Sequence, residues 1–439
     1  MKDQAASGPA TGRSTRVGAR AWVTLGILCF VYVLNFLDRQ LLSILAKPIQ
    51  DELHLSDSQL GRLGGIYFAL FYCLIAIPVG WLADKTNRVR VVSVACGLWS
   101  LATITCGLSA NYPQLVVSRM AVGVGEAGGV PPSYAIIADC FPSGRRGAAL
   151  GLYNLGPPMG QALGIAFGAS IAVAFSWRHA FVVLGGIGVI AALAVSVFLR
   201  EPRRGGLDSG AANVAALDPL KPGFMATVVM FLTNRSLLLI SLACGATQII
   251  TYGAGNFTTL ILMREKGMTL SEVAIYLALV TAIFMGGGIF VSGRVIDHFA
   301  RASKRAYAII PALSLLAAAP LFLGFTYARS WPIALLFLAG PTALNYFYLS
   351  SAVTFVQEEV RPDQRVLSGA LLLLVMNLIG MGVGPTFVGA MSDVFRASHP
   401  HNSLQLAFLS LTPFYVLAIA LFAVLAGTMK PAAAVGAKT

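Results

Sequence analysis

Apolar runs of about 20 residues recur along almost the whole chain, and they constrain its fold more than any other feature. A bilayer core about 30 Å thick needs about 20 residues of helix to cross it, and within lipid every backbone polar group must bond inside its own segment. Hydrophobic residues make up 57% of the 439 residues and charged residues 11%, so a soluble core would not hide the apolar surface. The sequence predicts an all-α membrane protein.

Twelve transmembrane helices are predicted, each bounded by changes from polar to apolar sequence. They are expected at residues 21–46, 60–83, 91–110, 114–138, 147–174, 178–199, 236–262, 271–296, 305–327, 331–356, 367–392 and 404–427. The polar segment before the first helix carries no cleavage-site pattern, and the first apolar run is too long for a signal-peptide core. We therefore expect the first helix to remain in the mature protein.

The Lys and Arg residues behind the net charge of +13 lie mostly on one predicted side of the membrane. Of the 31 Lys and Arg residues, 22 fall on the side that holds both termini, 7 on the other side and two within predicted helices. Because cytoplasmic loops are enriched in Lys and Arg, both termini are expected in the cytoplasm, with the protein in a bacterial inner membrane. The basic charge thus indicates orientation, and no nucleic-acid partner is predicted.

The two halves of the chain carry matching patterns. Gly80-Trp-Leu-Ala-Asp84-Lys-Thr-Asn-Arg88 and Gly293-Arg-Val-Ile-Asp297-His-Phe-Ala-Arg301 share one spacing, and Pro142-Ser-Gly-Arg145 matches Pro362-Asp-Gln-Arg365. Such internal repeats predict two parallel six-helix bundles. In chain order, the predicted parts are a cytoplasmic tail, a first bundle, a cytoplasmic linker, a second bundle and a second cytoplasmic tail, at 1–20, 21–199, 200–235, 236–427 and 428–439.

The repeated loop predicts a specific structural role at matched positions of the two halves. Glycine lets two helices approach closely, and an aspartate complements the N-terminus of a neighbouring helix. A single copy would also suit a solvated loop that follows the positive-inside pattern, but two matched copies favour the specific role; the gating role itself is what the family resemblance given below implies. The predicted gating residues are Gly80, Asp84, Arg88, Arg145, Asp297 and Arg301.

Four ionisable residues lie inside the predicted helices of the first half: Asp38, Arg39, Arg119 and Glu126. A charge near the bilayer centre costs several kcal/mol unless it is paired or faces water, so these residues are predicted to couple protons to transport. The helical rise puts Asp38 and Arg119 at similar depth and Glu126 roughly 10 Å further toward the termini. This predicts an Asp38–Arg119 pair and an arginine that changes partner as the acids titrate. The alternative is a permanent structural ion pair, which would be a weak stabiliser.

The matching helices of the second half carry neutral polar groups at mid-membrane depth, among them Thr251, Tyr346 and Thr386. A cavity with charge on one wall and aromatic or apolar groups on the other suits an amphiphile, although such polar residues also serve as interhelical hydrogen-bond partners. The predicted substrate-binding residues are Arg119, Glu126, Tyr153, Asn154, Gln248, Tyr252, Asn256, Asn345, Tyr348 and Asn377.

Enzymatic and cofactor sites are not predicted. The cysteines and histidines lack metal-ligand spacing, and none lies near Asp38 or Glu126 to complete a catalytic group. Gly123-Val-Gly-Glu-Ala-Gly128 matches a dinucleotide fingerprint but lies inside a membrane helix, without the strand that this motif requires. No metal and no cofactor are expected, and the proton gradient is the predicted driving force.

From Trp22 to Met429 the chain resembles the major facilitator superfamily, through the two repeated loops and Trp177-Arg178. Its first half is similar, more narrowly, to the spinster group of lipid transporters. The segments that carry this likeness are Asn35-Phe-Leu-Asp38-Arg39, Arg119-Met-Ala-Val-Gly-Val-Gly-Glu126-Ala, Ile137-Ala-Asp139 and Arg200-Glu-Pro-Arg-Arg-Gly205. In helix five, Gln161 follows Gly160 where the family motif continues with a second glycine.

The resemblance implies alternating access, with Asp38 and Glu126 as proton-responsive carboxylates, Arg119 as their cationic partner and Asp84 at a gate. Related transporters move lysophospholipids or sphingoid phosphates. The implied function is proton-coupled transport of a lysolipid, a sphingolipid-like molecule or another amphiphilic organic anion, by a monomer that contacts its substrate and membrane lipids. Two alternatives remain: a symporter of a small organic anion such as a sugar acid, bound by Arg39 or Arg119, and a non-transporting membrane sensor.

Overall fold

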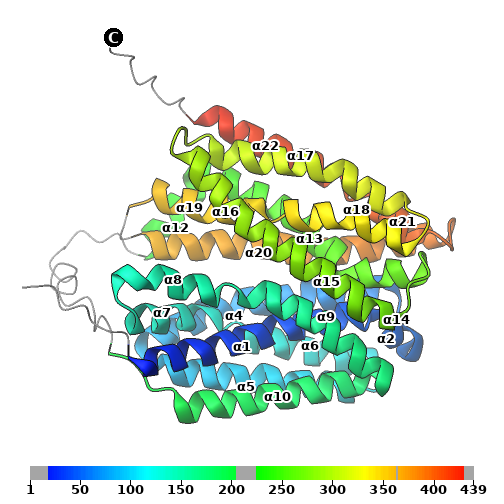
Figure 1. The fold of residues 1–439 in the computed structure, drawn as a ribbon, viewed down its shortest axis with the longest axis horizontal. Helices are drawn as coiled ribbons and strands as arrows, with labels where there is room; N and C mark the ends of the chain where they lie inside the picture. The colour runs from blue at the N-terminus through cyan, green and yellow to red at the C-terminus, as the bar shows by residue number, and fades with distance from the viewer. Residues whose placement is uncertain (1–17, 204–223, 362–363, 430–439) are drawn as a thin grey trace, which may run out of the picture.

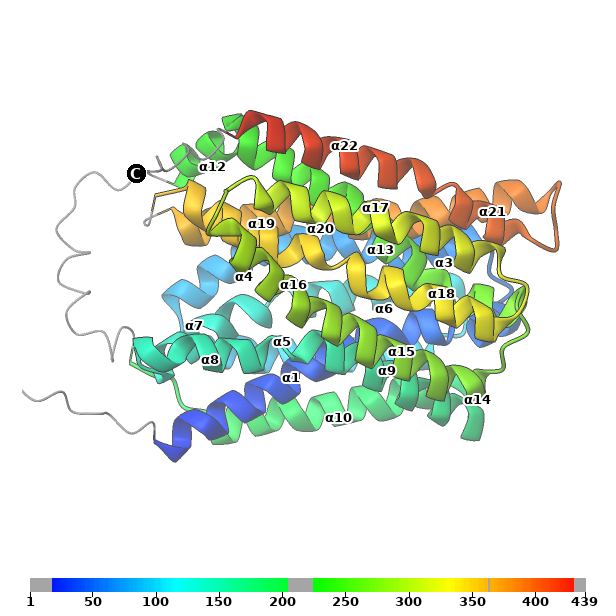
Figure 2. The same cartoon turned by 45° about the horizontal axis from the view of Figure 1, so that its top comes forward.

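The computed structural model describes residues 18–203, 224–361 and 364–429, and in these ranges helices are the regular structure. Two halves lie side by side, α1 to α10 forming the first and α12 to α22 the second (Figure 1). The described chain ends lie together at one end of the bundle, here called the terminal end (Figure 2). The other end is called the opposite end.

The first half follows the six predicted spans. Its helices are α1 (Ala19–Ile44), α2 (Ala46–Leu53), α3 (Asp57–Gly64), α4 (Ile66–Lys85), α5 (Arg88–Leu108), α6 (Tyr112–Glu126), α7 (Val130–Cys140), α8 (Ser143–Tyr153), α9 (Gly156–Ala174) and α10 (Trp177–Phe198).

The second half repeats this plan and adds short π-helical segments, η1 and η2, to its second span. Its elements are α12 (Phe224–Thr233), α13 (Arg235–Arg264), α14 (Leu270–Glu272), η1 (Val273–Leu277), α15 (Ala278–Val280), η2 (Thr281–Met285), α16 (Gly286–Ala300), α17 (Ala306–Tyr327), α18 (Trp331–Leu344), α19 (Phe347–Glu359), α20 (Arg365–Arg396), α21 (Ser403–Leu409) and α22 (Thr412–Thr428).

Eleven stretches of the described residues are long and apolar enough to cross a membrane. The twelfth, predicted at 114–138, is interrupted, because α6 ends at Glu126 and α7 begins at Val130. Glycines 128 and 129 lie in the break, and Pro131 and Pro132 at the start of α7 supply no N–H to continue the helical ladder. The chain still follows the predicted twelve-helix path, in which this span and several others, such as Arg145–Ala174 and Trp331–Glu359, are each made of two helical pieces.

The predicted linker at 200–235 contains α12, a short apolar helix that buries Thr227 and Phe231. Four large apolar side chains of this helix are exposed: Phe224, Met225, Val229 and Leu232. The rest of the linker at 204–223, most of both predicted tails and Pro362 of the repeated motif lie outside the described residues.

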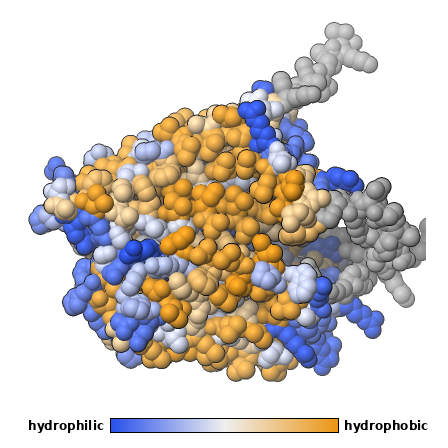
Figure 3. Space-filling view, turned by 180° about the vertical axis from the view of Figure 1, so that it is seen from behind, coloured by the Kyte–Doolittle hydropathy of each residue, from blue (hydrophilic) through white to orange (hydrophobic). Residues whose placement is uncertain are grey.

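An apolar belt surrounds the molecule between two polar ends, as Figure 3 shows for one face. Many large hydrophobic side chains point outward from the spans; Trp81 is 60% exposed and Leu336 75% exposed. Since water would strongly disfavour so large an apolar surface, lipid is the environment that this belt fits.

The two halves pack most closely at the opposite end, where backbone meets backbone. A Cβ atom added to Gly61 of α3 would lie 2.4 Å from the carbonyl oxygen of Pro385 in α20, and one added to Gly389 would lie 2.3 Å from that of Asp57. Only glycine permits such contacts, so this end is closed by direct helix contact.

Close packing also explains the glycines of the interrupted span. A Cβ atom on Gly125 would lie 2.5 Å from the backbone nitrogen of Trp99 in α5. We predict that Gly125→Ala lowers stability by about 1–3 kcal/mol, as overpacking does, measured as a lower midpoint of thermal unfolding in detergent. Gly147→Ala is the matched control, because its added Cβ meets nothing within 4 Å. Equal midpoints for both variants would contradict this packing.

Candidate functional site

The four intramembrane charges come from two helices, α1 and α6, and all lie inside the first half. Asp38 is 5% exposed, Arg119 2% and Glu126 0%, and the Arg39 side chain is 12% exposed. Four nearly desolvated charges are costly unless each is paired or offered to a ligand. Their partners therefore indicate what the site does.

Arg39 forms the ion pair of the site. Its Nε donates to Oε2 of Glu126 at 2.6 Å. Its guanidinium carbon also lies 4.9 Å, 5.2 Å and 4.9 Å from the ring centres of Phe36, Phe68 and Tyr72. The rings supply cation–π attraction, which is strongest where water is excluded. One carboxylate and three rings thus hold this cation.

Asp38 faces a different neighbour. One carboxylate oxygen accepts a hydrogen bond from the hydroxyl of Thr103 on α5, and the other has no hydrogen-bond partner among the described residues. Successive residues of a helix point about 100° apart, so Asp38 and Arg39 cannot both face α6. Asp38 therefore lies against α5 while Arg39 reaches Glu126.

Arg119 differs from Arg39 in its contacts. Its guanidinium lies 5.4 Å from the ring centre of Phe68, and its Nε and Nη1 have no hydrogen-bond partner within the described part of the chain. The predicted Asp38–Arg119 pair is absent from this structure, because the depths match but the two side chains do not meet. A buried arginine keeps its charge, so the unpaired N–H groups of Arg119 are able to donate to an anion.

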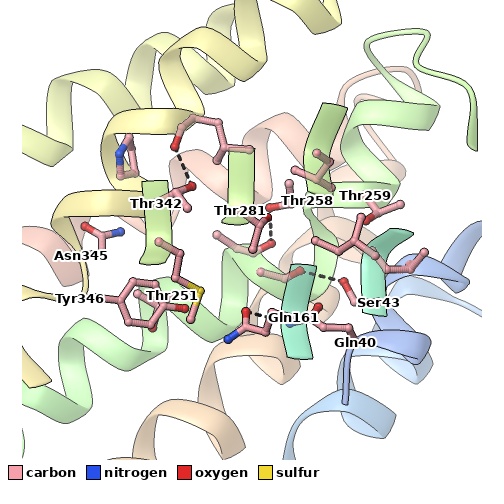
Figure 4. A pocket seen from close by; sticks show the side chains of 18 of the residues that line it. Gln40, Ser43, Gln161, Thr251, Thr258, Thr259, Thr281, Thr342, Asn345 and Tyr346 are labelled. Atoms are coloured by element: carbon pink, nitrogen blue, oxygen red, sulfur yellow. Dashed lines mark hydrogen bonds between the residues drawn. The ribbon is translucent and has the colours of Figure 1, made fainter. Parts of the chain in front are cut away.

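Two adjacent cavities lie between the halves. The first, of about 110 Å³, is lined by neutral residues, and the second, of about 80 Å³, is lined by Arg39 and Arg119 among others. The residues that line both are Gln40, Ser43, Gln161, Thr251, Gly255 and Tyr346. Figure 4 shows that side chains from several helices of both halves converge on the first cavity.

Several predicted substrate residues reach these cavities. Arg119, Tyr252 and Asn256 line the second, and Asn345 lines the first. The remaining predicted residues, which line neither cavity, are Glu126, Tyr153, Asn154, Gln248, Tyr348 and Asn377.

Glu126 is held by Arg39, and four of the other remaining residues also have internal partners. The amide nitrogen of Gln248 donates to the hydroxyl of Tyr348 at 3.1 Å. Tyr153 stacks on Tyr32 with ring centres 4.4 Å apart, and Asn154 accepts a hydrogen bond from Tyr134. These contacts fit the interhelical packing role that was the alternative for such residues.

Sequence reasoning missed much of the neutral lining. The missed polar residues are Gln40, Ser43, Thr258, Thr259, Thr281 and Thr342, with Gln161 noted only as a departure from a motif. A weak signal exists in α1, where Gln40 and Ser43 follow Arg39 inside an apolar span. Serine and threonine in membrane helices commonly bond their own backbone, so sequence alone does not distinguish those that line a cavity.

The predicted gate residues at the terminal end are only partly in contact. Arg88 is buried and donates to Asp139 at 2.7 Å and to Glu201 at 2.6 Å, which ties α5 to α7 and to the segment after α10. Arg145, Asp297 and Arg301 are exposed, and the Asp84 side chain lies outside what the structure describes. The close approach expected at Gly80 and Gly293 is not present in this structure, since a Cβ on either meets nothing within 4 Å.

An unpredicted charge cluster joins the halves at the opposite end. The fully buried Asp57 accepts hydrogen bonds from Arg264 at 2.9 Å, Arg396 at 2.7 Å and Ser392 at 2.6 Å. In return Asp393 accepts from the backbone N–H groups of Asp57 and Ser58 at the N-terminus of α3, where a negative charge is favoured. We call Asp57, Arg264, Arg396, Ser392 and Asp393 the opposite-end cluster.

We predict that Asp57→Asn weakens closure of the opposite end. The substitution removes the buried carboxylate charge that Arg264 and Arg396 both contact, so the attraction that joins the halves there weakens. Spin labels at the exposed positions Ala110 and Ala397, one in each half, should show a distance distribution shifted to longer separations.

Glu52→Gln is the control for this measurement. Glu52 lies at the same end but accepts from Trp177 and Arg178 within the first half. Burial alone would raise the pKa of Glu52, but hydrogen bonds from Arg178 and Trp177 lower it overall. Unchanged distances in Asp57→Asn, or the same shift in Glu52→Gln, would show that the cluster does not hold the halves together.

Comparison with known proteins places the chain among transporters. The model of the Major Facilitator Superfamily matches residues 28–385. An MFS-type efflux pump of Mycolicibacterium smegmatis is 31% identical over 375 residues, covering 85% of each chain. Protein spinster homolog 1 of Homo sapiens is 26% identical and covers 88% of this chain and 76% of its own.

A solved structure is similar over nearly the whole fold. It is a bacterial homologue of the human lysosomal transporter Spinster, in an inward-facing and unoccupied conformation. Its TM-score is 0.84 at 28% sequence identity, and the match covers 94% of this chain and 98% of the other.

Proposed function

The chain belongs to the Major Facilitator Superfamily, and from that premise we propose that it is a proton-coupled secondary transporter of an organic anion. Membership makes it a multi-pass integral membrane protein of a transporter family and not an enzyme, and the resemblance to spinster proteins is confirmed. The finer statements, namely the anion, the proton and the direction in the membrane, are argued below from the site.

The observation that carries the proposal is the bare guanidinium of Arg119. It is buried, permanently charged, and lines the second cavity with two nitrogens unpaired within the described structure. Desolvating such a group without a partner is costly, and a carboxylate or phosphate matches its planar donors. We therefore assign Arg119 the anionic group of the substrate.

Proton coupling follows from the placement of Arg39. In this structure Glu126 neutralises it, yet Arg39 lines the same cavity as Arg119. A proton on Glu126 would remove the ion pair and leave Arg39 available to a bound anion. Binding of a proton and binding of the anion then favour each other, and by linkage the effect is reciprocal. This arrangement favours symport, with Asp38 as a second acid beside Arg39.

Alternating access is supported by the contrast between the two ends. Glycine contacts and the opposite-end cluster join the halves at one end, whereas Gly80 and Gly293 are unpacked at the other. The similar solved structure is described as inward-facing. With the positive-inside distribution, we place the terminal end and both termini in the cytoplasm, in a bacterial inner membrane. We expect a monomer that needs no cofactor.

Both predicted substrate classes, an amphiphilic lipid-like anion and a small organic anion, would put their charge at Arg119. A non-transporting sensor would bind the same anion but would not exchange it across the membrane. Counterflow of a labelled anion in proteoliposomes separates a transporter from a sensor, because a sensor gives none.

We predict that Glu126→Gln abolishes anion-driven proton entry but preserves anion counterflow. The amide cannot release a proton and cannot hold Arg39 as an ion pair, so the anion site persists uncoupled. Proteoliposomes containing a pH dye are given lysophosphatidate, hexanoate or D-gluconate, and internal acidification is followed. For each anion that acidifies wild-type vesicles, the variant should fall to the level of protein-free vesicles, and Asp38→Asn should reduce the signal.

Glu52→Gln serves as the control, since Glu52 lies outside the cavity at the opposite end. It should retain the wild-type proton signal. Acidification in Glu126→Gln and Asp38→Asn equal to wild type would refute proton coupling through these carboxylates.

A further inference from the structure

The first cavity is lined by apolar residues and by neutral polar residues. Aspartate, glutamate, lysine, arginine and histidine are all missing from its lining residues. Ten of the lining residues nevertheless carry a hydroxyl or an amide, and Figure 4 shows them converging from both halves. They are Gln40, Ser43, Gln161, Thr251, Thr258, Thr259, Thr281, Thr342, Asn345 and Tyr346. Such a lining offers an ion no opposite charge, and it offers a ligand with hydroxyl groups several hydrogen-bond partners beside its apolar surface.

The hydroxyl groups offer acceptors to this cavity. Thr258 donates its proton to the carbonyl of Ala254 at 2.8 Å, and Thr342 donates to that of Leu338 at 2.8 Å. Ser43 donates across the halves to the carbonyl of Gly255 at 2.8 Å. Because a hydroxyl has one proton and two lone pairs, each of these oxygens can still accept a hydrogen bond.

Two further groups add to this acceptor character. The amide nitrogen of Gln40 donates to the carbonyl oxygen of Gln161 at 3.0 Å, which leaves the Gln40 oxygen available. Thr259 is 1% exposed, and its hydroxyl has no hydrogen-bond partner among the described residues. Buried polar atoms normally have partners, so an orphan in a cavity wall points to a ligand.

A ligand that matches this lining brings neutral O–H donors. An ammonium group would need a carboxylate nearby to offset its desolvation, and the lining has none. An alkyl chain would leave the acceptors unpaired. Sites built to hydrogen-bond a hydroxyl can reject the analogue that lacks it by about 10⁴-fold. The two cavities, of about 110 and 80 Å³, are also small beside the roughly 300–1,000 Å³ of pockets for drug-sized ligands.

We propose that the substrate is a small polyhydroxylated organic anion of the sugar-acid type, with its anionic group at Arg119 and its hydroxyl groups in the first cavity. This rests on the proposed function, because it presumes that Arg119 receives the anion. It deepens that function by choosing between the two predicted substrate classes. Thr258 and Thr342 are then specificity-determining residues, acting through the oxygen that faces the ligand.

The test compares two six-carbon carboxylates of equal charge, D-gluconate and hexanoate, by titration calorimetry on the purified full-length protein. Gluconate should bind at least about 100-fold more tightly. Thr258→Val and Thr342→Val should each weaken gluconate binding by about five- to tenfold, the worth of one hydrogen bond, and leave hexanoate unchanged. Thr247→Val is the matched control, since Thr247 is buried, donates to its own helix and lines neither cavity.

Three results would overturn the hydroxyl subsite. Hexanoate could bind as tightly as gluconate or more tightly, gluconate could fail to bind, or the valine variants could keep the same gluconate affinity as Thr247→Val. Arg119→Gln separates this failure from failure of the proposed function. Loss of hexanoate binding in Arg119→Gln, with no preference for gluconate in wild type, overturns the subsite and leaves the anion site standing. Binding of both probes that is unchanged in Arg119→Gln overturns the anion site as well.

Discussion

The cost of holding charge away from water governs this structure. In the first half, Glu126 and three aromatic rings satisfy Arg39, and a threonine hydroxyl contacts Asp38. The Arg119 guanidinium lies 5.4 Å from the ring centre of Phe68, two of its nitrogens have no hydrogen-bond partner among the described residues, and Arg119 lines the second cavity. Buried ion pairs are weak sources of stability, so a site that leaves one guanidinium bare in such surroundings is better explained by ligand binding than by folding. In the proposed function, an anion would supply the hydrogen-bond partner that the Arg119 guanidinium lacks among the described residues.

The same constraint operates differently at the opposite end. There, two arginines, a serine and backbone amides surround the buried carboxylate of Asp57, and glycine backbones touch beside it. Such a cluster is satisfied only while the halves are together, because its members come from both. Glycine contacts add little attraction of their own but permit the close approach on which the hydrogen bonds depend. Closure at this end is thus conditional on a few geometric matches, which suits an interface that must open.

The sequence predicted the fold because apolar length and charge sidedness are local properties. It also identified the four intramembrane charges, since their cost in lipid holds whatever their partners. It did not predict that Glu126 would meet Arg39 instead of Arg119, because partners depend on the rotation of α1 about its axis. The hydroxyls of Thr258 and Thr342 were missed for a related reason. In sequence, a threonine in an apolar helix resembles a packing residue, and only the positions of the facing helices show that it lines a cavity. The break at 127–129 was marked by glycines and prolines, yet the apolar run around it obscured the interruption.

The division of the cavity lining between the halves bears on how the proposed substrate would contact both of them. The arginines come from the first half, whereas Thr258, Thr281 and Thr342 come from the second. An anion with hydroxyl groups would contact both, so the substrate itself would complete the contact between the halves. Without an anion, Arg119 stays buried without a hydrogen-bond partner among the described residues, and the threonine oxygens accept no hydrogen bond from a ligand, both at a cost. In the proposed cycle, a bound anion would therefore relieve at Arg119 a cost that the empty protein bears.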